Sequence, residues 1–162
     1  MGFIGVVSTK KELIEIKKHI QNNYKVIELK KTSIKNIRNV KFDMIIFNRD
    51  IDLEICEYEY MKDILKQVDY IIVNSDINFT IFEKIELNYP IKIITYGFNP
   101  KASILISSVK EDYILISIQR KIQKNNREIL ENQERKIEIK YNEKNKIYEK
   151  IIIFILKELH NL

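Results

Sequence analysis

Acidic and amide side chains follow two apolar runs of this sequence, and these residue types could bind a metal or a ligand. Asn74 and Asp76 follow the run 70–73, and the run 42–47 is followed by Asn48. Five carboxylates come next: Asp50, Asp52, Glu54, Glu57 and Glu59. Carboxylates at a strand end could hold Mg²⁺. An acidic loop leading into a helix start explains them more simply, so we expect no metal site.

The apolar runs themselves predict a buried sheet. Strands are expected where the runs are short and continuous, at 3–7, 24–29, 42–47, 70–73 and 91–95. Helical spacing of apolar residues predicts helices between them: one that Ser8 or Thr9 caps and that ends at Asn22 and Asn23, and others at 57–67 and 79–87. Residues 33–39 fit a short helix or a loop. Continuously apolar strands are typical of strands that are covered on both faces. The fold class is therefore α/β: a mainly parallel, Rossmann-like sheet with helices on both faces, in three layers.

The pattern changes after Pro100. Residues 102–109 and 113–120 predict a hairpin, whereas 127–140 fits either another strand pair or a loop. A helix is expected at 145–159, where apolar residues recur along one face. We expect a single domain over residues 1–162, with an alternating core at 1–98, a β-rich C-terminal extension at 99–142 and a final helix at 143–162.

The first strand-to-helix turn lacks the glycines that wrap a phosphate. It runs Val7, Ser8, Thr9, Lys10, with no glycine after Gly5, so neither a dinucleotide fingerprint nor a P-loop is present. Thr9 and Glu12 instead have the spacing of a helix capping box. Cys56 lies among glutamates, which disfavour a reactive thiolate. The sequence thus predicts no catalytic residue and no cofactor.

Composition and charge indicate which cellular compartment and which classes of partner to expect. The 162 residues include 28 basic and 23 acidic side chains, for a net charge of +5. Aromatic residues are not interleaved with the basic ones, so nucleic acid is disfavoured as a partner. The longest apolar run, 151–156, is much shorter than the ~20 residues that span a bilayer. With 1 cysteine in the chain, a cytoplasmic, reducing location is expected.

Several strand ends, taken in order, resemble the central ATP-binding domain of the Mur ligases. The segment 42–53 (FDMIIFNRDIDL) resembles the family's apolar strand and following loop, and 58–65 resembles the next helix. Segment 70–76 (YIIVNSD) is similar to the strand that ends in Asn-x-Asp-Asp, and 93–97 (IITYG) matches the Ile-Thr-Tyr-Gly strand. The resemblance covers roughly residues 42 to 107 and implies a sheet whose strand ends could contact a nucleotide.

The departures from this family concern its catalytic parts. The phosphate loop is missing, no histidine follows Asp50, and Ile77 replaces the second Asp of the Asn-x-Asp-Asp pattern. In the family the strand-end Asn contacts adenine, which Asn74 could still do. The resemblance therefore implies a reduced, non-catalytic relative. The candidate ligand-binding residues are Asn48, Asp50, Asn74, Asp76, Tyr96, Gly97 and Lys101. For the loop from Gly97 to Lys101, a structural turn is the simpler alternative.

Three functions are consistent with the sequence. The first is a non-catalytic Mur-ligase-like module that binds a protein or a cell-envelope intermediate. The second is a small nucleotide-binding protein or enzyme that uses the carboxyl ends of the parallel strands. The third is an interaction protein, a homodimer formed through the basic segment 120–135 and the apolar face of the last helix. The partner is accordingly an unknown protein or small molecule, or a second copy.

Overall fold

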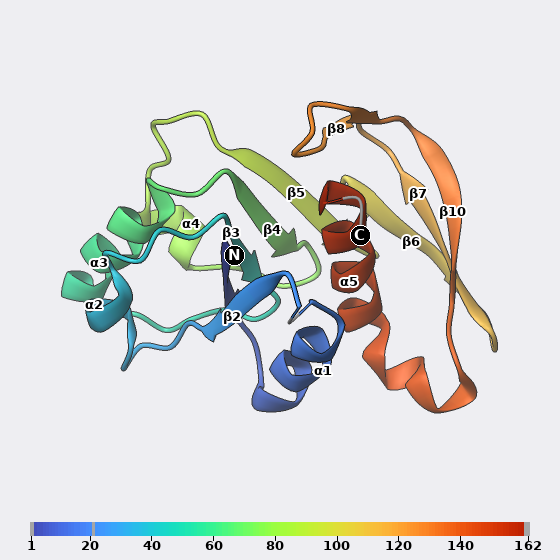
Figure 1. Ribbon diagram of the computed structural model, residues 1–162, viewed down its shortest axis with the longest axis horizontal. Helices are drawn as coiled ribbons and strands as arrows, with labels where there is room; N and C mark the ends of the chain where they lie inside the picture. Colours follow the sequence, from blue (N-terminus) through green and yellow to red (C-terminus); the bar gives the residue numbers. More distant parts are fainter. Residues whose placement is uncertain (1, 21, 161–162) are drawn as a thin grey trace. The chain divides into compact units, whose positions relative to one another are not determined.

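The first part of the chain forms a parallel sheet. A computed structural model describes residues 2–20 and 22–160, and the chain divides into two compact units, Met1–Ile93 and Ile94–Leu162 (Figure 1). Strands of the first unit lie in the order β4-β3-β1-β2, and each neighbouring pair is parallel. Their bounds are β1 (Gly2–Val7), β2 (Tyr24–Glu28), β3 (Met44–Phe47) and β4 (Tyr70–Asn74).

Helices connect these strands, as parallel pairing requires. They are α1 (Lys10–Ile20), α2 (Ile34–Ile37), α3 (Ile55–Leu65) and α4 (Ile81–Lys84). The alternation of strand and helix confirms the predicted α/β class with a mostly parallel sheet. Strands β3 and β4 are buried along their whole length, which explains their continuously apolar sequences.

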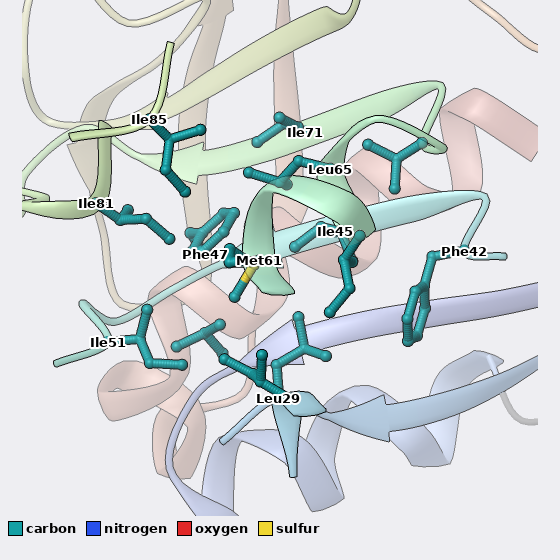
Figure 2. Close-up of a cluster of buried hydrophobic side chains, with 14 of the residues drawn as sticks. Leu29, Phe42, Ile45, Phe47, Ile51, Met61, Leu65, Ile71, Ile81 and Ile85 are labelled. Atoms are coloured by element: carbon teal, nitrogen blue, oxygen red, sulfur yellow. The ribbon is translucent and has the colours of Figure 1, made fainter. Parts of the chain in front are cut away.

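One face of this sheet packs on α2, α3 and α4 in a hydrophobic cluster. Figure 2 shows Met61 and Leu65 of α3 lying over side chains of β3 and β4. Phe47 lies at the centre of an aromatic group, with its ring centroid 5.2 Å from that of Phe82 and 6.1 Å from that of Phe79. Because these rings meet edge to face, Phe47 gains specific contacts in addition to its burial.

Two helices differ from their predicted bounds for local reasons. The predicted helix at 79–87 is reduced to α4, because Ile85 adopts an extended backbone and lies buried in the cluster. Helix α3 begins two residues before the predicted position 57, since Glu54 and Glu57 form a capping box that fixes its start at Ile55.

The second unit contains four longer strands and a C-terminal helix. Strand β5 (Lys92–Gly97) pairs in parallel with β6 (Ile104–Val109), and the predicted hairpin joins β6 to β7 (Tyr113–Ile118). The segment left open as strands or loop forms two short paired strands, β8 (Ile122–Gln123) and β9 (Ile129–Leu130), and then β10 (Gln133–Glu138), which pairs with β7. The division of the chain at residues 98 and 142 stays a prediction.

The predicted final helix is α5 (Ile147–His160), preceded by a 3₁₀ turn at Tyr141–Lys146. Its apolar side chains, including Ile151, Ile152 and Leu156, are buried within the chain. The homodimer expected through the basic segment 120–135 and this helix stays a prediction.

Truncating Phe47 tests the aromatic centre of the first unit. We expect Phe47→Ala to lower the free energy of unfolding by about 3 to 5 kcal/mol, because it removes a fully buried ring and leaves a cavity. Phe98→Ala is the matched control, since that ring is 47% exposed, and it should cost less than about 1 kcal/mol. Urea denaturation followed by circular dichroism measures both, and equal costs would contradict the assignment of the core.

Candidate functional site

The carboxyl ends of β1, β3 and β4 carry a connected set of polar groups. The backbone N–H groups of Asn48 and Arg49 both donate to the Val7 carbonyl, at 3.0 and 3.2 Å. The loop that leaves β3 is thereby fixed to the end of β1. This places Arg49 beside the first turn of α1, and Asn48 beside the last residue of β4.

Glu12 occupies the first turn of α1 with its carboxylate buried. Its Oε2 accepts a hydrogen bond from the Thr9 N–H at 2.9 Å, and the Thr9 hydroxyl accepts one from the Glu12 N–H at 3.3 Å. This confirms the predicted capping box. Oε1 accepts hydrogen bonds from Nε of Arg49, at 3.0 Å, and from the Nη2 group of the same side chain. Both carboxylate oxygens of Glu12 are therefore bound within the chain.

Glu12 remains ionised because the interactions that lower the pKa of its carboxyl together exceed the effect of burial, which raises it. Burial raises the pKa of the Glu12 carboxyl, but hydrogen bonds from Arg49 and the Thr9 backbone and the positive charge of Arg49 lower it, with a further contribution from Asn48. The net result is a pKa below the ordinary glutamate value. The helix start thus holds a fixed negative charge that belongs to the protein itself.

Asn48 and Asn74 pair with each other under the strand ends. Nδ2 of Asn74 lies 3.4 Å from Oδ1 of Asn48, and Oδ1 of Asn74 accepts the Asp76 N–H at 3.0 Å. The two amides are 1% and 0% exposed. These predicted site residues are therefore adjacent, but their amides face the interior of the unit rather than solvent.

Asp50 and Asp76 lie in the loops that follow β3 and β4. Oδ2 of Asp50 accepts hydrogen bonds from the Thr80 hydroxyl at 3.1 Å and the Thr80 N–H at 3.4 Å, which ties the β3 loop to the start of α4. Asp76 is exposed, in the turn that Asn74 closes. Among residues 2–20 and 22–160, no group of three or more His, Cys, Asp or Glu side chains is arranged to hold a metal ion.

The remaining predicted site residues lie in the second unit. Tyr96 is fully buried, and its ring centroid is 6.2 Å from that of Tyr148. Gly97 has a φ of 145°, a conformation that favours glycine. Lys101 is exposed, and its N–H donates to Oδ1 of Asn99 at 3.0 Å. These bonds match the alternative reading of this loop as a structural turn; its role in ligand binding stays a prediction.

Arg49 is the part of this network that sequence reasoning missed. It is the one basic residue between Lys41 and Lys62, and it directly follows the candidate Asn48. Arg49 is a single basic residue within an acidic segment, at the end of a strand. This position indicates an ion pair with a carboxylate elsewhere in the chain. Nothing in the spacing identified Glu12 as that carboxylate, because the two residues meet only once β1 and β3 pair.

Comparison with known proteins yields no relative from which a function could be transferred. No family model matches the chain, and no curated protein is significantly similar to it. Within the part of the chain that the structure describes, no helix has the length and apolar character needed to cross a membrane. The function must therefore be inferred from the geometry of the strand ends.

Removing the Glu12 charge tests the network. We expect Glu12→Gln to lower the free energy of unfolding at neutral pH by about 1 to 3 kcal/mol, because it weakens the charge-assisted hydrogen bonds from Arg49. Glu83→Gln, at an exposed position of α4, should change it by less than about 0.5 kcal/mol. Chemical denaturation at pH 7 measures both variants.

The same pair of variants has an expected pH dependence. Because the folded-state pKa of Glu12 is lowered, its stabilisation is complete above the unfolded-state pKa of about 4.3 and is lost as the pH falls through the folded-state value. The difference between wild type and Glu12→Gln should therefore shrink below about pH 4. A difference that is unchanged at pH 3 would contradict an ionised Glu12 as its source.

Proposed function

We propose that this chain is a non-catalytic binding module, a Mur-ligase-like domain without ATP-dependent chemistry, whose partner is a protein or a cell-envelope intermediate. The observation that carries the proposal is the carboxylate of Glu12 at the start of α1. In nucleotide-binding α/β proteins the N-terminus of the first helix receives phosphate. Here the chain's own carboxylate accepts the Thr9 N–H that would face such an anion.

Electrostatics supports the exclusion of phosphate from this position. Glu12 is ionised at neutral pH, and its compensating cation, Arg49, already donates to it through two nitrogens. A phosphate brought to the same helix start would meet the like charge of the Glu12 carboxylate. Phosphoryl transfer needs cations that stabilise the developing charge, and the cation beside this helix start, Arg49, is already paired with Glu12.

The nucleotide-binding alternative is less well supported by the geometry. It requires the Asn74 amide to meet a base, yet that amide is fully buried and holds Asn48 and the turn at Asp76. Reaching it would break hydrogen bonds that the interior cannot replace, and each unsatisfied buried group costs about 1 to 3 kcal/mol. A partner that docks on the surface avoids this cost.

A thermal-shift screen tests the proposal. The protein is heated with ATP, ADP and UDP-sugars, each with Mg²⁺, and we expect no change in melting temperature. A ligand at 100 times its Kd would add about 2.7 kcal/mol, which is readily visible. A saturable shift that disappears in Asn74→Ala but persists in the exposed-site control Glu83→Gln would contradict the proposal and favour a nucleotide-binding protein.

A further inference from the structure

Strand β2 forms the outer edge of the first unit's sheet. It follows β1 in the strand order, and no strand among residues 2–20 and 22–93 pairs with its other side. Figure 1 shows it in blue, next to β1. None of its five residues is fully buried, whereas every residue of β3 and β4 is. β2 is therefore the one strand of this sheet whose backbone and side chains both reach the surface.

Backbone alternation fixes which groups of β2 face outward. Leu29 donates its N–H to the Val6 carbonyl at 2.9 Å, so the main chain at Leu29 faces β1. Successive residues of a strand direct their N–H and C=O groups to opposite edges. The N–H and C=O groups of Val26 and Glu28 accordingly point away from β1, and a further strand could pair with them.

A shallow groove runs along this edge. Its lining comes from β1, from β2 and from one turn of α1: Phe3, Lys17, Tyr24, Lys25, Val26 and Ile27. The side chains are mostly apolar, but the rim carries two cations. Within the described residues neither Lys17 nor Lys25 has a carboxylate at ion-pair distance, unlike Lys30, which pairs with Glu28 at 2.8 Å. The groove thus combines outward-facing backbone groups, apolar surface and two lysines outside ion pairs. Asp43 is an acidic neighbour of the groove and acts electrostatically on Tyr24.

The lysines beside the β2 edge help to decide which kind of partner could pair with it. A second copy pairing antiparallel through β2 with Lys25 opposite Lys25 would place like charges across a strand pair, which is destabilising. Lysine on an edge strand is also a known device against such self-pairing. An acidic segment meets no such penalty, since its carboxylates compensate Lys17 and Lys25. Charge therefore favours an acidic partner over a second copy.

We propose that the β2 edge binds an extended acidic segment of a partner protein, which adds to the sheet as a further strand. Main-chain hydrogen bonds to Val26 and Glu28 supply affinity, and alternate side chains of the segment meet the apolar groove and the two lysines. The inference rests on the proposed function, because it gives the binding module a surface and gives its partner a chemical class.

Peptide binding to the intact chain tests this site. The probe is a fluorescein-labelled peptide of alternating glutamate and valine, about six residues long to match a typical strand. We expect saturable binding by fluorescence anisotropy. A peptide with lysine in place of glutamate should not bind. The acidic peptide with N-methylated backbone nitrogens should lose affinity at least about tenfold, since it cannot donate to the edge strand.

Two protein variants locate the site. Val26→Pro removes an outward N–H that β1 does not use, and edge strands tolerate proline at such a position; we expect it to fold and to weaken binding about tenfold. Lys25→Glu should weaken binding as well, whereas Lys110→Glu makes the same charge change in the exposed turn between β6 and β7 and should not. Melting curves verify that each variant is folded.

Each outcome decides the inference. Equal binding of the N-methylated peptide would show simple charge attraction and overturn it, as would the absence of binding. A concentration-dependent dimer in light scattering that Lys25→Glu or Val26→Pro abolishes would assign the edge to a second copy instead. If the acidic peptide does not bind and nucleotides do not bind either, the proposed function stands while the β2 site is rejected. A nucleotide shift with intact peptide binding would contradict the proposed function and not this site.

Discussion

A buried, ionised carboxylate holds the carboxyl edge of the sheet together. Glu12 binds the backbone of Thr9 through one oxygen and the guanidinium of Arg49 through the other. Because Thr9 precedes α1 and Arg49 follows β3, this one side chain links the start of a helix to the end of a neighbouring strand. Asn48 and Asn74 continue the network to the end of β4. Burying a charge is costly unless it is paired and hydrogen-bonded, and here both conditions are met.

The two kinds of sheet edge in this unit differ in what they offer a partner. At the carboxyl ends of the strands, the amides of Asn48 and Asn74 are buried, and the ionised Glu12 carboxylate binds Thr9 and Arg49 of the same chain. Along β2, main-chain groups face outward, and Lys17 and Lys25 line the neighbouring groove. Open α/β sheets commonly bind ligands at the carboxyl ends of their strands. In this unit the amides at the strand ends are buried, whereas the edge strand β2 reaches the surface.

The sequence predicted the first unit better than the site. Continuous apolar runs such as 42–47 and 70–73 were sufficient for a parallel sheet, because strands buried on both faces tolerate little else. The Thr9–Glu12 capping box was also predicted, since its partners are three residues apart. The pair of Glu12 with Arg49 was not, because its partners are 37 residues apart and meet only through strand order. The candidate residues Asn48 and Asn74 lie next to each other, but their burial follows from packing that spacing does not report. The short α4 likewise depends on a tertiary contact, the packing of Ile85 in the core.

The most direct test of this account is the pKa of Glu12 itself, measured by NMR titration of its carboxyl carbon in the folded protein, with Arg49→Met as the comparison. The account predicts a folded-state value below the ordinary glutamate value in wild type and a higher value in the variant, since Arg49 supplies both hydrogen bonds and charge. A wild-type value at or above the ordinary one, unchanged by Arg49→Met, would show that the carboxylate does not hold the strand ends. The site would then be open to an anion after all.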